Sequence, residues 1–145
     1  MKARNVQFEM RHLRSAGPLA CWTSTLLLLA ASSTLTAQQA GLAGVWRGES
    51  ICVQQGTACK NEQVVYYVDA IPDHPDQVQI RADKIVNGEA ITMGTSAWHV
   101  DSDHHTVEWK TPRQVWLLSF SGMHMEGTLT LSDGTVVRKA SLRKQ

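Results

Sequence analysis

Two cysteines, Cys52 and Cys59, form the residue pair with the clearest chemical role in this 145-residue chain. Six residues separate them, whereas zinc-binding cysteines are typically about two to four residues apart and come with further ligands. We therefore predict a disulfide, which implies an oxidising compartment. Closing so short a loop contributes about 2–3 kcal/mol to stability in the chain-entropy picture.

Histidines and aspartates gather around one expected turn. His99, His104 and His105 are interleaved with Asp101 and Asp103, and imidazole and carboxylate groups are ligands of transition metals. However, neighbouring strand residues point to opposite faces of a sheet, and nothing in this spacing holds three ligands in tetrahedral geometry. We predict no metal site and no cofactor.

The sequence lacks the motifs of the common hydrolases. It contains neither a Gly-x-Ser-x-Gly elbow nor a His-Glu-x-x-His zinc motif. Glu49, Glu62 and Glu126 are interpreted as strand-surface residues and not as a glycosidase pair. Once bridged, the two cysteines offer no thiolate. We predict that the protein is not an enzyme.

The N-terminal stretch has the layout of a secretory signal. A basic segment precedes the apolar run Leu26–Ala31, and small residues follow. A retained anchor is the alternative, but the run from Ala20 to Ala37 is rich in Ser and Thr and shorter than the roughly 20 apolar residues that a bilayer requires. We predict a signal peptide over residues 1–37, a barrel domain over residues 41–145 without a membrane span, and export to the periplasm or the cell exterior. Translation starts at either Met1 or Met10.

Charge and length limit what the mature chain does. Residues 1–37 hold four of the 14 basic residues and one of the 13 acidic ones, so the remainder has a net charge of −2. Nucleic-acid binding calls for a basic patch, which this balance does not favour. The remaining length suits one small domain.

After the signal, apolar residues recur with a period of two, and turn residues interrupt them about every ten positions. Asn87-Gly88 is typical of a type I′ hairpin turn, and Gly94 predicts a bulge or bend within a strand. We expect eight strands, near residues 45–53, 63–71, 77–86, 89–99, 106–110, 115–121, 125–131 and 135–143.

Short connections between successive strands predict an antiparallel meander. No connection has room for the helix that a parallel crossover needs. Closing such a meander removes its exposed edges, so we predict an all-β, single eight-stranded up-and-down barrel. A flattened two-sheet sandwich is the alternative.

Gly44-Val45-Trp46 in the first strand and Arg138 in the last resemble the minimal signature of lipocalin-like barrels, and streptavidin-like barrels begin similarly. The resemblance implies that Trp46 closes the bottom of the barrel and that Arg138 packs across its ring. Such a cation–π contact contributes roughly 0.5–2 kcal/mol.

Over nearly its whole mature length the chain also resembles a group of small uncharacterised bacterial exported proteins. That resemblance implies a bacterial exported domain and brings no activity with it. The segments that carry it are Gly44–Cys52, Lys84–Gly88 and Met125–Leu129.

The aromatic content of so small a domain indicates a binding function. Aromatic side chains that face inward either fill a barrel or line a pocket for a small apolar or amphipathic molecule. The inward face stays open at this point, because a one-residue shift in register exchanges the two faces. The candidate ligand-binding residues are Trp98, Trp109 and Trp116, with Arg47, Glu49, Tyr66 and Arg81 as polar groups at the mouth.

A protein partner is the alternative to a small molecule. The chain resembles serralysin-type protease inhibitors in size, export, barrel topology and a bridge near the first strands, which implies inhibition of a protease or lysozyme. Such inhibitors act through the N-terminal segment or exposed loops, here Gln38–Leu42, Val53–Ala58 and Asp73–Asp76. A structural component of the cell envelope without a ligand is a third hypothesis.

Overall fold

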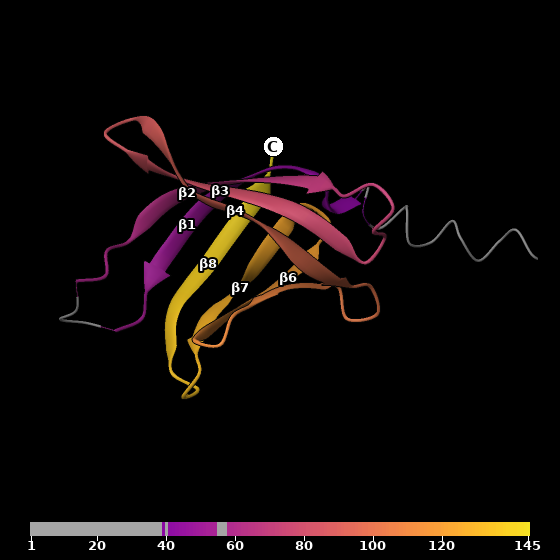
Figure 1. Cartoon of the computed structure of the whole chain (residues 1–145). Helices are drawn as coiled ribbons and strands as arrows, with labels where there is room; N and C mark the ends of the chain where they lie inside the picture. Colours follow the sequence, from indigo (N-terminus) through magenta and orange to yellow (C-terminus); the bar gives the residue numbers. More distant parts are fainter. Residues whose placement is uncertain (1–38, 40, 55–57) are drawn as a thin grey trace, which may run out of the picture. The chain divides into compact units, whose positions relative to one another are not determined.

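The computed structural model describes residues 39, 41–54 and 58–145, and these residues form a closed barrel of eight antiparallel strands (Figure 1). Each strand pairs with its neighbours in sequence, and the last strand pairs with the first. The predicted up-and-down barrel is confirmed, and the sandwich alternative is wrong. The predicted signal, residues 1–37, lies outside the described residues. The strands are β1 (Gly44–Cys52), β2 (Glu62–Ala70), β3 (Gln77–Val86), β4 (Glu89–Asp101), β5 (Thr106–Lys110), β6 (Gln114–Ser121), β7 (His124–Leu131) and β8 (Val136–Lys144).

Alternation of side chains along each strand builds the core. In β6, Leu118 is fully buried and Trp116 and Phe120 pack against the core, whereas Leu117 between them is 42% exposed. β1, the first half of β3 and β8 show the same period of two, because successive strand residues point to opposite faces. β2 departs from it, since Val64, Val65 and Tyr66 are all buried. The buried core comprises Leu42, Trp46, Val64, Tyr66, Val68, Val78, Ile80, Trp98, Val100, Val107, Leu118, Met125, Ala140 and Leu142.

Local backbone features match two sequence predictions. Asn87 and Gly88 both have positive φ, 52° and 85°, as a type I′ turn requires. In the β3–β4 pair, Ala82 lies opposite Gly94 while Asp83 lies opposite Thr92, so Met93 is an extra residue in β4. This bulge adjoins Gly94, where the sequence predicted a bulge or bend.

Two glycines allow the sheet to curve tightly enough to close. A Cβ atom on Gly48 would overlap the carbonyl oxygen of Ser141 on β8, and one on Gly127 would overlap the carbonyl oxygen of Leu117 on β6. The neighbouring backbones therefore pass so close to these two positions that only glycine fits there. Glycine kinks and bulges of this kind provide the corners of small barrels.

A helical turn before β1 closes one end of the barrel. Leu42 is fully buried there, and its carbonyl oxygen accepts a 2.8 Å hydrogen bond from Nε1 of Trp46. The Gln39 side-chain amide donates to the carbonyl oxygens of His74 and Gln77 at 3.1 and 3.0 Å, which ties the turn to the β2–β3 connection. We call this the closed end.

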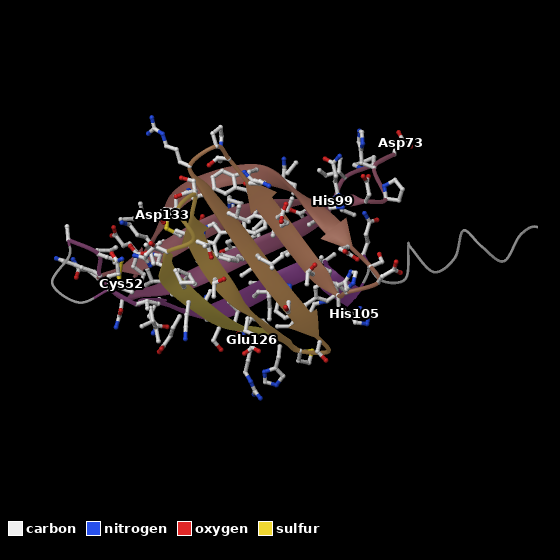
Figure 2. The ribbon with its side chains drawn as sticks, turned by 90° about the horizontal axis from the view of Figure 1, so that it is seen from below. Cys52, Asp73, His99, His105, Glu126 and Asp133 are labelled. Atoms are coloured by element: carbon white, nitrogen blue, oxygen red, sulfur yellow. A yellow bond between two sulfur atoms is a disulfide. The ribbon has the colours of Figure 1, made fainter. Side chains whose placement is uncertain are left out.

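The opposite end, called the open end, carries the bridged loop and the turns after β3, β5 and β7. Figure 2 shows Cys52 and Asp133 on this side and Asp73, His99 and His105 on the other. Among the described residues, no helix is long and apolar enough to span a membrane.

The predicted pairing of Trp46 with Arg138 is wrong. Lys144 is the basic residue above the Trp46 ring, with Nζ 5.6 Å from the ring centroid. The antiparallel register explains the difference, because Trp46 lies opposite Lys144 whereas Arg138 lies opposite Cys52 at the open end. Lys144 Nζ also donates a 2.6 Å hydrogen bond to the carbonyl oxygen of Gly41.

The predicted bridge between Cys52 and Cys59 is confirmed, with the two Cα atoms 6.0 Å apart. It joins the end of β1 to the residues that lead into β2. Asn61 supports the same connection, since its Oδ1 accepts a 2.9 Å hydrogen bond from the backbone N–H of Cys52.

We expect Gly127→Ala to lower the free energy of unfolding by at least about 1–3 kcal/mol, because the added methyl group forces the β6 backbone away. Gly94→Ala is the matched control, since a Cβ atom there meets nothing within 4 Å, and its effect should stay within about 0.5 kcal/mol. Urea unfolding followed by circular dichroism measures both. Equal losses in the two variants would contradict the role assigned to Gly127.

We expect the double variant Cys52→Ser, Cys59→Ser to unfold at lower urea concentration, with a loss of about 2–3 kcal/mol set by the short closed loop. Reductant should shift the wild-type curve towards that of the variant and leave the variant unchanged. A wild-type curve that does not move after complete reduction would show that the bridge contributes no stability.

Candidate ligand-binding cavity

A cavity of about 470 Å³ occupies the half of the barrel next to the open end. It exists because β4 and β5 pair only over His99–Asp101 within the described part of the chain. The earlier part of β4 has β3 as its neighbour, and its residues Met93, Gly94, Thr95, Ser96 and Trp98 form one side of the cavity. The β3–β4 hairpin extends past the barrel body at this end (Figure 1).

One wall of the cavity is aromatic. Trp98 and Trp109 stack with ring centroids 6.3 Å apart and an interplanar angle of 29°, and Trp116 lies directly opposite Trp109 in the β5–β6 pair. Nε1 of Trp98 donates to Oγ of Ser96 at 3.0 Å. Trp109 and Trp116 line the cavity, and their indole N–H groups have no hydrogen-bond partner among the described residues. Ile80, Ala82 and Leu129 complete the apolar lining.

The facing wall carries charge. Arg138 Nη1 lies 3.0 Å from Glu62 Oε2 and donates to Ser50 Oγ at 2.8 Å, while Nη2 donates to the carbonyl oxygen of Lys60 at 2.8 Å. Lys84 Nζ lies 3.6 Å from the other carboxylate oxygen of Glu62. The Glu62 and Arg138 side chains are 22% and 16% exposed, so solvent and salt screen this network less than a surface pair.

Tyr66 lies beside this charged wall. It is 3% exposed and lines the cavity, and its hydroxyl has no hydrogen-bond partner in the described part of the chain. Burial raises the pKa of Tyr66 to about 12; nearby Arg138 lowers it and Glu62 raises it further, both to a smaller extent. The phenol is therefore a neutral donor at any physiological pH.

The structure brings together Tyr66, Trp98, Trp109 and Trp116, the aromatic residues that the sequence identified as ligand candidates. These side chains come from β2, β4, β5 and β6. They share one interior because each has the same inward parity in its own strand.

The structure places Arg47, Glu49 and Arg81 on the outer face, so the prediction that they line the mouth is wrong. Arg47 and Glu49 have the opposite parity to buried Trp46. Arg81 packs over the Tyr67 ring at 4.0 Å and pairs with Asp83 at 3.5 Å. The Glu49 carboxylate accepts a 2.9 Å hydrogen bond from the Gln63 side chain.

Sequence reasoning missed the polar groups that do face the cavity. Glu62 was interpreted as a surface residue, Arg138 was assigned to the other end, and Ser50 and Gln114 were not considered. Ser50 lies opposite Glu62, and both have the inward parity of Trp46. Trp46 is the signal that identifies these inward positions, because it is fully buried and Ser50 and Glu62 share its parity.

The histidine and aspartate residues around the β4–β5 turn have a structural role. Asp101 Oδ2 lies 2.7 Å from His104 Nδ1, and Oδ1 accepts the backbone N–H groups of Asp103 and His104. The side-chain hydrogen bond lowers the pKa of Asp101 and raises that of His104. The described residues contain no group of three or more side chains suited to hold a metal ion.

A second hollow of about 470 Å³ lies on the outer surface over β1, β6, β7 and β8. Six of its nine lining residues are polar or charged, including Glu49, Glu126 and Lys139, and it contains no aromatic side chain. Ligand pockets are mostly apolar with a few placed polar groups, so the interior cavity is the better candidate.

No protein-family model matches the chain, and none of the curated proteins matches it in sequence. Among solved structures, the chain is similar to a redesigned β-barrel, with a TM-score of 0.55 and 16% identity over 74% of this chain and 95% of the other. It is also similar to a de novo designed fluorescence-activating β-barrel, with a TM-score of 0.49 and 18% identity over 74% and 96% of the two chains. At 16% identity the likeness to the redesigned barrel shows the fold alone: the chain is a closed antiparallel β-barrel.

Proposed function

We propose that the protein binds a small amphipathic molecule inside its barrel. The observation that carries the proposal is the cavity of about 470 Å³ with an indole wall on one side and a hydrogen-bonded charged wall on the other. This volume falls within the range of about 300–1,000 Å³ typical of small-molecule sites. The indoles contact the apolar part of the ligand, and the polar part lies toward Tyr66 and Arg138.

Two inward-facing aromatic residues are partly exposed. This supports a barrel interior in which they line a cavity over one that side chains fill completely. Trp98 is 5% exposed, whereas Trp109 and Trp116 are only partly buried although they face the barrel interior. Both residues line the cavity. A ligand bound there covers apolar surface of the indole rings and also supplies hydrogen-bond acceptors.

The proposed setting is the cell envelope of a bacterium. The signal-like N-terminus and the Cys52–Cys59 bridge support an oxidising compartment outside the cytoplasm. In that compartment a small barrel of this kind serves as a carrier, and no chemical step on the ligand is part of the proposal.

The arrangement before β1 supports a carrier over an inhibitor of a protease or lysozyme. An inhibitor that acts through its N-terminal segment needs that segment accessible. Here Leu42 is fully buried in the closed end, and the Gln39 side chain is bonded to the β2–β3 connection. The described part of the segment is therefore committed to the barrel.

We expect the neutral fluorescent probe N-phenylnaphthylamine to bind the protein with one-to-one stoichiometry and to quench the tryptophan emission. Ala82→Leu should weaken binding by about tenfold or more, equivalent to about 1.4 kcal/mol, because the larger side chain projects into the cavity. Fluorescence titration measures both.

Ala97→Leu is the matched control, since Ala97 lies on the neighbouring strand and is exposed on the outer face. It should bind the probe like the wild type. Equal affinity in Ala82→Leu and wild type would place the bound probe outside the barrel, and an absence of saturable binding would contradict the proposed function itself.

A further inference from the structure

The described charged side chains are distributed unevenly between the two ends of the barrel. Aspartates occupy the turns of the closed end, at Asp73, Asp76, Asp101 and Asp103, while the basic residues Arg143 and Lys144 at the end of β8 also lie there. Figure 2 shows Asp73 at this end, remote from Cys52. At the open end the basic residues Lys60, Lys84, Lys110, Arg113 and Arg138 outnumber the acidic residues Glu62, Asp83, Glu89 and Asp133 by one.

An excess of positive charge is also found in the network around Glu62, which lines the cavity together with Arg138, whereas Lys84 contacts Glu62 and is not itself a lining residue. Glu62 lies between two cations, with Arg138 Nη1 at 3.0 Å from one carboxylate oxygen and Lys84 Nζ at 3.6 Å from the other. One carboxylate neutralises one of the two cations, so the group of three carries a net charge of +1. Lys84 is the more available cation, because its side chain is 35% exposed whereas Arg138 is bonded to Ser50 and Lys60.

Neutral donors surround this positive group on its inner side. Tyr66, Trp109 and Trp116 line the cavity, and the hydroxyl and the two indole N–H groups have no hydrogen-bond partner among the described residues. Each of these groups offers a hydrogen to an acceptor, and tyrosine is protonated here at physiological pH. A cationic ligand would meet donors and like charge, whereas an anion would meet complementary groups.

We propose that the ligand is an anionic amphiphile, whose head group lies at the open end beside Lys84 and Arg138 and whose apolar part lies against Trp98, Trp109 and Trp116. This inference rests on the proposed function and specifies the chemical class of its ligand. The positive end also attracts an anion over a distance, because the field of the open end steers it toward the mouth.

Three ligands of equal chain length separate this inference from the proposed function. Decanoate, decanol and decylammonium are each titrated against the bound N-phenylnaphthylamine probe, below their micelle-forming concentrations. We expect decanoate to displace the probe at the lowest concentration and decylammonium at the highest. Added salt should weaken the binding of decanoate and leave the binding of decanol unchanged. Decyl sulfate, as a second anion, distinguishes a requirement for a carboxylate from a requirement for negative charge.

Two charge-removing variants change the net charge around Glu62 in opposite directions. Lys84→Gln removes the excess charge and should weaken decanoate by about three- to tenfold, within the range of one charge-assisted contact. Glu62→Gln raises the excess of positive charge and should strengthen the binding of decanoate. Lys139→Gln, on the outer face of β8, makes the same change in total charge as Lys84→Gln and should alter decanoate affinity little.

The decanol affinity shows whether each variant still forms the cavity. If decanol and decanoate bind equally, or decylammonium binds most tightly, the inference about the anion is wrong and the proposed function stands. If Lys139→Gln weakens decanoate as much as Lys84→Gln, net charge and not the wall accounts for the preference, which also overturns the inference. If no ligand displaces the probe, the proposed function fails with it.

Discussion

The early end of β5 is the constraint on which the rest of this barrel depends. β4 has 13 residues and β5 has five, so the two strands cannot pair along the full height of the barrel. Pro112 follows β5 almost immediately and has no N–H to donate to a ladder. Thr111 then organises the turn, because its Oγ1 accepts the backbone N–H groups of Arg113 and Gln114. The mouth of the cavity follows from this short strand.

Because one end of the barrel is closed and the other is open, the inward-facing residues are stabilised differently at the two ends. At the closed end Leu42 and Trp46 exclude water, and Lys144 packs over the indole. At the open end polar groups stay inside, and a buried charge is costly unless it is paired and hydrogen-bonded. Glu62 and Arg138 satisfy this requirement. The last strand thus supplies one basic residue to each end, six positions apart on the same inward face.

Local sequence features predicted the strands and turns, because alternation and turn chemistry operate over a few residues. The type I′ turn at Asn87-Gly88 and the irregularity at Gly94 belong to this class. Pairing between distant strands did not follow from the sequence. The assignment of Arg138 to Trp46 failed for that reason, since both residues face inward and only the β1–β8 register decides that Lys144 is the neighbour.

The cavity was equally inaccessible from the sequence, because its volume depends on which side chains meet across the closed barrel. In the closed half, the inward positions hold bulky residues such as Val100, Val107, Leu118, Met125 and Leu142, which fill the space. In the open half they include the small residues Ser50, Ala82, Gly94 and Ser96.

Small side chains on β1, β3 and β4 therefore leave room opposite the indoles of β5 and β6. Interior packing at native density stabilises a fold, and here the filled half makes that contribution. The lined half is held by the paired charges of Glu62 and Arg138 and by strand pairing, so its unfilled volume is compatible with a folded barrel. Stability and the proposed binding thus depend on different layers of the same interior.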